Sequence, residues 1–120
     1  MVTFRAAVVL LLSATMVACS TPSDLRAKTP IYTGQSNKDA AALAGCIADD
    51  LEAQKMRNVQ ARPTTNGYTV TRVDQTLYGP DTPILIDILK TPQSNRIEAF
   101  SALPFAAGDR MIISAIKKCE

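Results

Sequence analysis

The chain has 120 residues, of which 20% are charged, and its formal net charge is +2. This length has room for one domain with one small core. The cationic and anionic residues are interspersed, which argues against nucleic-acid binding, because phosphate contacts need a clustered basic face. Histidine is absent from the sequence, so nucleophiles activated by histidine and histidine-based zinc sites are excluded.

The first nineteen residues have the layout of a secretory leader. Met1 to Arg5 carry one positive charge, and residues 6–17 are almost wholly apolar. The apolar run is about a dozen residues long, whereas a membrane-spanning helix needs roughly 20. We therefore expect a cleaved signal peptide over residues 1–18, in preference to a permanent anchor helix or a buried core helix.

The apolar run ends in Met16-Val17-Ala18-Cys19. These four residues resemble the lipobox of bacterial lipoprotein precursors, with Met16 where that class usually has leucine. The resemblance covers only the first twenty residues. It implies cleavage between Ala18 and Cys19, attachment of diacylglycerol to the Cys19 thiol, and acylation of the new amine, for instance by palmitate. Two or three such chains hold a small domain firmly at a bilayer. Ser20, in place of aspartate, implies transport to the outer membrane, facing the periplasm or the cell surface.

Residues 20–35 mix serine, threonine, proline and glycine with scattered apolar residues. This composition predicts a flexible spacer between Cys19 and the folded domain. Fully extended, such a spacer would reach about 50 Å, enough to clear the lipid headgroups. Two alternatives remain open for Pro30-Ile31-Tyr32, which either belongs to the spacer or docks on the domain as an extended arm.

The folded domain is expected over residues 36–120, beginning with a helix that ends near Arg57. Ser36 and Asp39 can accept hydrogen bonds from the free backbone N–H groups at a helix start. Apolar residues then recur at helical spacing. They predict one core-facing stripe, formed by Leu43, Cys46, Ile47 and Leu51.

Beyond this helix the pattern is that of β-strands. Alternation and β-branched residues predict strands over 59–62, 68–77, 84–89 and 96–102, with the third in the centre of the sheet. Asn66-Gly67 is a strong hairpin signal, and Gly79-Pro80-Asp81 is expected to interrupt the second strand. The strands would form an antiparallel meander of three or four.

A second helix is expected from Gly108, with Asp109 as its cap. Its apolar face comprises Met111, Ile112, Ala115, Ile116 and Cys119. The predicted fold is therefore α+β, with an N-terminal helix, a strand meander and a C-terminal helix. Both helices would cover one face of the sheet and leave the other face to solvent or to a partner.

The three cysteines can be divided between two roles. If Cys19 carries lipid, Cys46 and Cys119 remain as an even pair. We therefore predict a disulfide that joins the two helices and closes a loop of about 74 residues, for which loop-closure entropy gives roughly 4 kcal/mol. The alternative is a pair of buried free thiols.

No catalytic, metal-binding or cofactor motif stands out. Asp49 and Asp50 are adjacent carboxylates, but neighbours on a helix point about 100° apart and fit a solvated face better than acid–base catalysis. Four arginines are candidate partner or anion contacts if they gather on one sheet face; otherwise each is simply solvated. Two tyrosines are candidate contacts or strand-packing residues. These residues are Arg57, Arg62, Arg72, Arg96, Tyr68 and Tyr78.

These observations predict a small, non-enzymatic lipoprotein of the bacterial envelope. It would need no cofactor besides its covalent lipid, and it would bind another protein or an envelope component through the open sheet face. The alternative is a periplasmic inhibitor or immunity protein directed against a toxin or a lytic enzyme.

Overall fold

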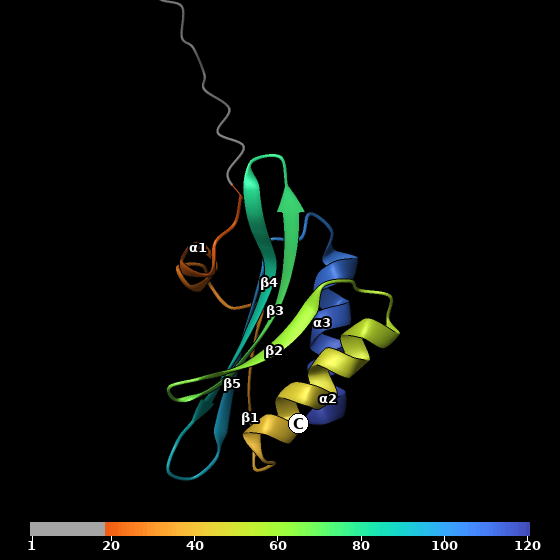
Figure 1. Ribbon diagram of the computed structural model, residues 1–120. Helices are drawn as coiled ribbons and strands as arrows, with labels where there is room; N and C mark the ends of the chain where they lie inside the picture. Colours follow the sequence, from red (N-terminus) through yellow and green to blue (C-terminus); the bar gives the residue numbers. More distant parts are fainter. Residues whose placement is uncertain (1–18) are drawn as a thin grey trace, which may run out of the picture.

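A computed structural model of the protein describes residues 19–120 (Figure 1). The predicted signal peptide, its cleavage residue Ala18 included, lies outside these residues. The described chain forms an antiparallel sheet of five strands with helices on both of its faces. Its elements are α1 (Pro22–Arg26), β1 (Tyr32–Ser36), α2 (Ala40–Ala53), β2 (Val59–Thr64), β3 (Gly67–Thr76), β4 (Gly79–Lys90), β5 (Asn95–Ser101) and α3 (Ala106–Cys119).

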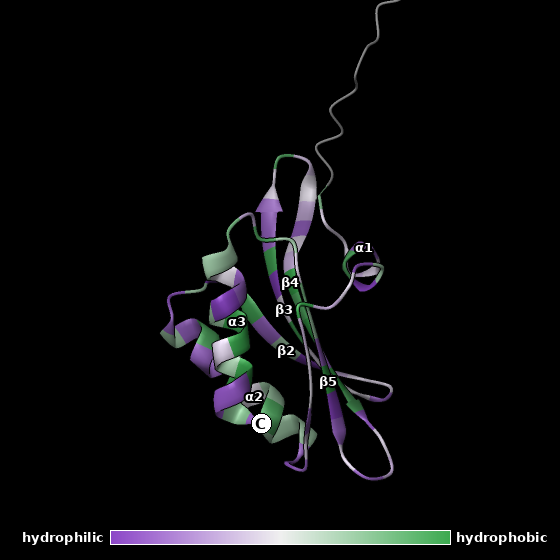
Figure 2. Ribbon diagram, turned by 180° about the vertical axis from the view of Figure 1, so that it is seen from behind, coloured by the Kyte–Doolittle hydropathy of each residue, from purple (hydrophilic) through white to green (hydrophobic). Residues whose placement is uncertain are grey.

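The α+β prediction is confirmed. The strand order is β1-β5-β4-β3-β2, so β4 is the central strand and β2 to β5 form the predicted meander. The helices α2 and α3 lie side by side on one face of the sheet (Figures 1 and 2). Alternation along β4 sends Ile84, Ile86 and Ile88 toward these helices. Leu85 and Asp87 therefore lie on the opposite face, which we call the outer face.

The prediction of a flexible spacer is wrong for most of residues 20–35, which contain both α1 and β1. The short α1 forms because Thr21 and Asp24 make a reciprocal capping box and Pro22 occupies the first turn. The docked-arm alternative holds: the Ile31 N–H donates to the Ala99 carbonyl at 2.8 Å, and β1 adds a fifth strand beside β5.

The two longer helices differ slightly in extent from the prediction, and α2 ends at Ala53 instead of near Arg57. In α2, the Asp39 side chain accepts from the Ala42 N–H at 3.1 Å and serves as the cap, while Ser36 ends β1. The third helix begins at Ala106, two residues before the predicted start, so Asp109 lies within its first turn instead of capping it. A carboxylate there still favours the positive helix end.

The hairpin formed by β3 and β4 is longer than predicted. Gly79-Pro80-Asp81 belongs to β4, and the turn consists of Leu77 and Tyr78 between the paired residues Thr76 and Gly79. Gly79 has φ of +109°, which glycine adopts readily, so it carries the chain out of the turn and into the strand. The tip of this hairpin projects past the ends of α2 and α3 (Figure 1).

Candidate functional site

Cys19 lies beside Thr76, at the end of the sheet where β3 and β4 turn. Its Sγ atom is 3.5 Å from the Thr76 hydroxyl, and its thiol is outside any disulfide. Ser20 is fixed to β4, because its N–H donates to the Asp81 carboxylate at 2.6 Å and its carbonyl accepts from the Thr82 N–H at 2.7 Å. The residue predicted to carry lipid therefore lies directly against the folded domain.

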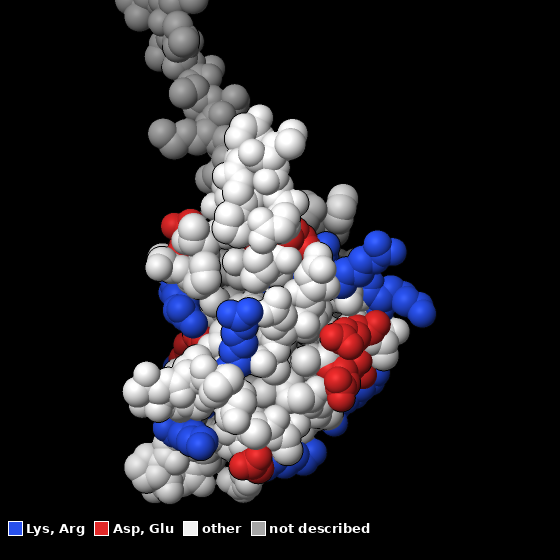
Figure 3. Space-filling model, in the orientation of Figure 1, with Lys and Arg blue, Asp and Glu red and all other residues white. Residues whose placement is uncertain are grey.

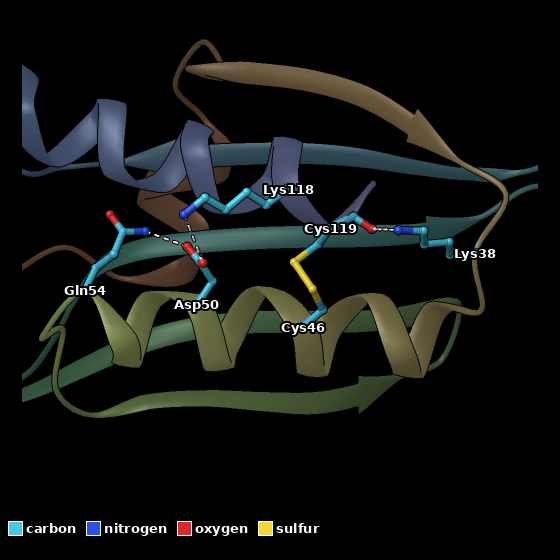
Figure 4. The surroundings of a disulfide bond; sticks show 6 residues. All are labelled: Lys38, Cys46, Asp50, Gln54, Lys118 and Cys119. Atoms are coloured by element: carbon cyan, nitrogen blue, oxygen red, sulfur yellow. Dashed lines mark hydrogen bonds and ion pairs between the residues drawn. A yellow bond between two sulfur atoms is a disulfide. The ribbon is translucent and has the colours of Figure 1, made fainter.

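The predicted disulfide is present between Cys46 of α2 and Cys119 of α3, whose Cα atoms are 5.8 Å apart (Figure 4). Cys119 is buried, as expected for the apolar face of α3. Cys46 is exposed, and it therefore lies at the margin of the α2 stripe instead of within the core. The bridge links the two helices near the surface of the helix layer.

Polar contacts on both sides of the disulfide join α3 to α2 and to Lys38, which directly precedes the α2 cap (Figure 4). The Lys38 ammonium donates to the Cys119 carbonyl at 2.8 Å. Further along α2, Asp50 accepts from Gln54 at 2.6 Å and lies 3.4 Å from the Lys118 ammonium. Asp50 is thus engaged in a helix-to-helix contact, and Asp49 is exposed. The acidic pair offers no convergent geometry for catalysis.

The outer face of the sheet is partly covered, which corrects the expectation of a fully open face. The α1 residue Leu25 is fully buried against Leu85 and Phe100, forming a small second core. Next to it, the Arg26 guanidinium donates to both carboxylate oxygens of Asp87, at 2.8 and 2.9 Å. The hydrogen bonds with Asp87 raise the pKa of Arg26 above its usual range.

A polar hollow of about 240 Å³ adjoins this ion pair on the outer face. The Thr69 hydroxyl lies in it and donates to Asp87 at 2.9 Å, so the buried Asp87 carboxylate accepts from both Arg26 and Thr69. We call this site the outer hollow; its lining residues are Arg26, Thr64, Thr65, Asn66, Thr69, Asp87 and Leu89. Its walls are largely hydrogen-bonding groups, which suit a polar ligand surface.

The four predicted arginines do not gather in one place. Arg62 and Arg96 lie on the outer face, but on β2 and β5, which β3 and β4 separate. Arg96 is engaged with Glu98 at 2.8 Å. Arg57 and Arg72 lie together on the other side of the sheet, in a groove at the ends of α2 and α3. The sequence-based grouping is therefore correct for one pair only.

The groove beside Arg57 and Arg72 has a volume of about 430 Å³. Arg72 is paired with Asp74 at 3.1 Å, which offsets its charge. The remaining wall is mainly apolar and includes the exposed ring of Phe105. Such a groove suits an apolar segment more than a free anion.

The two predicted tyrosines have different environments. Tyr68 is half-buried and packs against the main core, so strand packing explains it. Tyr78 is exposed in the β3–β4 turn. A third tyrosine, Tyr32 of β1, donates its hydroxyl proton to Glu120, and this hydrogen bond, with burial and the carboxylate charge, raises the pKa of Tyr32 to about 12.

Sequence reasoning missed the pairing of Arg26 with Asp87. One signal for it was present: Asp87 is a lone charge inside the apolar run Ile84 to Leu89, and a charge in a central strand requires a partner. The partner itself was not predictable, because Arg26 lies in the stretch expected to be a spacer.

Comparison of the chain with family models, curated proteins and solved structures gave no match. Over residues 19–120, none of the helices has the length and apolarity needed to cross a membrane. Within the same range, no three cysteine, aspartate or glutamate side chains come together as metal ligands.

Proposed function

We propose that this chain is the precursor of a small lipoprotein of the bacterial cell envelope. Its anchor would be diacylglycerol and an N-acyl chain on Cys19, and Ser20 after that cysteine favours the outer membrane. The proposal is carried by the position of Cys19, which ends the lipobox-like stretch, lies outside the disulfide and contacts Thr76 at the end of the domain. A disulfide between Cys46 and Cys119 is consistent with an exported protein.

The lipid attachment is tested by expressing the full chain in a bacterial host with labelled palmitate and determining the mass of the first peptide. We expect label on the wild type, and cleavage before Cys19. The Cys19→Ser variant should be unlabelled and should leave the membrane fraction. The matched control, Cys46→Ser, should remain labelled and membrane-bound. An unmodified Cys19 in a chain that still carries residues 1–18 would contradict the proposal.

The anchored domain would act without catalysis, by binding a protein or another envelope component through the uncovered part of its outer face. Arg62 supports this reading, because it is exposed on the edge strand β2, beside the outer hollow. Arginine forms forked hydrogen bonds with carboxylates and other oxyanions. An edge strand also offers free backbone groups to a partner. The expected partner surface is therefore acidic or extended.

Site-specific photocrosslinking in cells tests this surface. A photoreactive residue in place of Arg62 should capture an envelope component, whereas one in place of the exposed Ser114 on α3 should not. A captured toxin or lytic enzyme would identify the protein as an inhibitor or immunity protein. Crosslinks from position 114 in the absence of any from position 62 would contradict binding through the outer face.

A further inference from the structure

The tip of the β3–β4 hairpin presents two large side chains to solvent. Leu77 is 99% exposed and Tyr78 is 75% exposed. They occupy the two-residue turn, which is braced from within, because the Thr76 hydroxyl donates to the Gly79 carbonyl at 2.7 Å and accepts from the Tyr78 N–H at 3.2 Å. These hydrogen bonds fix the conformation of the turn, so that Leu77 and Tyr78 form an exposed hydrophobic tip at one end of the molecule.

The predicted attachment point of the lipid lies beside this tip. The Cys19 sulfur is within 3.5 Å of the hydroxyl of Thr76, the residue directly before the turn. The two backbone-anchored contacts of Ser20 with β4 fix this placement. The contacts of Ser20 with Asp81 and Thr82 thus place the anchor and the hairpin at the same end of the sheet. In Figure 1 the orange N-terminal segment lies beside the β3–β4 turn.

The chemistry of the tip suits a lipid interface. Residues 75–80 contain no charged side chain, and on the face seen in Figure 3 the tip itself shows neither basic nor acidic side chains, which begin below it. Leucine favours the acyl region, and tyrosine concentrates at the level of the headgroups, where its ring is apolar and its hydroxyl is hydrated.

We propose that Leu77 and Tyr78 insert into the bilayer surface beside acylated Cys19, as a second membrane contact of the same molecule. This inference rests on the proposed lipid anchor. The anchor alone would leave the domain free to rotate about one point, whereas the added contact sets its orientation. The β2–β3 and β4–β5 turns, at the opposite end of the sheet in Figure 1, then face away from the membrane.

Two side chains alone bind a bilayer only weakly and reversibly. The anchor changes this, because it holds the tip at a high effective concentration next to the lipid and makes insertion intramolecular. The contact should therefore appear in the acylated protein and be absent when acylation is absent.

Fluorescence can locate the tip, because the chain contains no tryptophan. The full chain is expressed with residues 1–18, purified in its acylated form, and reconstituted into vesicles of phosphatidylethanolamine and phosphatidylglycerol with or without brominated acyl chains. Tyr78→Trp places the only indole at the tip. The matched control, Gln93→Trp, places it at an exposed site in the β4–β5 turn.

The brominated lipids should lower the Tyr78→Trp emission below its value in unbrominated vesicles, because an indole at the interface lies beside the acyl chains, and should leave the Gln93→Trp emission unchanged. Leu77→Asp in the Tyr78→Trp background should abolish the quenching while the protein still sediments with the vesicles. If an acylated, vesicle-bound Tyr78→Trp protein is quenched no more than the control, the tip contact is wrong and the anchor stands. If the purified chain carries no acyl group, the anchor and the contact fall together.

Discussion

Arg26 and Asp87, which are 61 residues apart in the sequence, form a bidentate ion pair. Asp87 is almost wholly buried in the central strand, whereas about half of the Arg26 side chain is exposed. The pair, together with Leu25, attaches α1 to the outer face of the sheet. This attachment makes residues 20–35 a part of the domain and holds Cys19 close to it.

Removing the charge from Arg26 should destabilise the domain, because Asp87 would be left buried with only the Thr69 hydroxyl as a side-chain donor. We expect Arg26→Met to lower the free energy of unfolding by about 1–3 kcal/mol, less than for a fully buried pair. Urea unfolding measures the change. Lys28→Met, at an exposed neighbouring site, is the control and should stay within about 0.5 kcal/mol of the wild type.

A double-mutant cycle separates the ion pair from the packing of α1. Asp87→Asn combined with Arg26→Met should cost about 1 kcal/mol less than the sum of the two single variants. Strict additivity would show that the two side chains do not interact in solution.

The disulfide should be a large contribution to stability. Cys46→Ser opens a loop that spans a sequence separation of 73 residues, and we expect it to lower the free energy of unfolding by about 2–4 kcal/mol. Because Cys46 is exposed, serine there leaves no cavity in the core. Unfolding by urea, followed by circular dichroism, provides the measurement.

Two controls accompany this variant. Reduced wild type should match Cys46→Ser, and Cys19→Ser should unfold like the oxidised wild type. A loss of stability in Cys19→Ser equal to that in Cys46→Ser would contradict the division of the three cysteines between anchor and fold.

The stability of the domain should fall at high pH through Tyr32. Its pKa is about 12 in the folded protein and about 10 in an unfolded chain. The folded state therefore holds the proton more tightly, so the contribution is fully present below pH 10 and is lost as the pH rises toward 12. Urea midpoints recorded across this range should decrease more steeply for the wild type than for Tyr32→Phe.

Tyr78→Phe serves as the control for this profile, because Tyr78 is an exposed turn residue. It should show the same pH dependence as the wild type. Identical curves for Tyr32→Phe and the wild type would show that the hydrogen bond to Glu120 does not form in solution.

The two longer helices α2 and α3, the four-strand meander and the disulfide were predictable, because each depends on a local periodicity or on the number of cysteines. Ile84, Ile86 and Ile88 alternate visibly, and the α3 stripe ends in Cys119. The edge strand β1 was not predictable from composition, since Tyr32–Ser36 is polar and half-exposed and becomes a strand by pairing with β5. Tertiary pairing decided its structure.

The candidate site was predictable only in part for a related reason. Sequence alternation shows which arginines share a face, but the separation of Arg62 from Arg96 depends on strand order, which places β3 and β4 between them. The proximity of Cys19 to Leu77 and Tyr78 depends in turn on the contacts of Ser20 with β4. Such contacts between distant segments leave no periodic signal.

The last prediction concerns the hairpin between β2 and β3, which the structure confirms, with Thr65 and Asn66 as the turn and Gly67 as the first residue of β3. Gly67 has φ of +154°, and a Cβ atom there would lie 1.9 Å from the Ile88 carbonyl oxygen. The backbone of the central strand cannot give way by this amount without loss of pairing. We expect Gly67→Ala to lower the free energy of unfolding by more than about 2 kcal/mol.

Gly45, inside α2, provides the matched control. A Cβ atom on Gly45 would have nothing within 4 Å, so Gly45→Ala should instead raise the free energy of unfolding by about 0.5–1 kcal/mol through helix propensity. Chemical unfolding of both variants tests the pair, and equal effects of the two substitutions would contradict the close approach of Gly67 to β4.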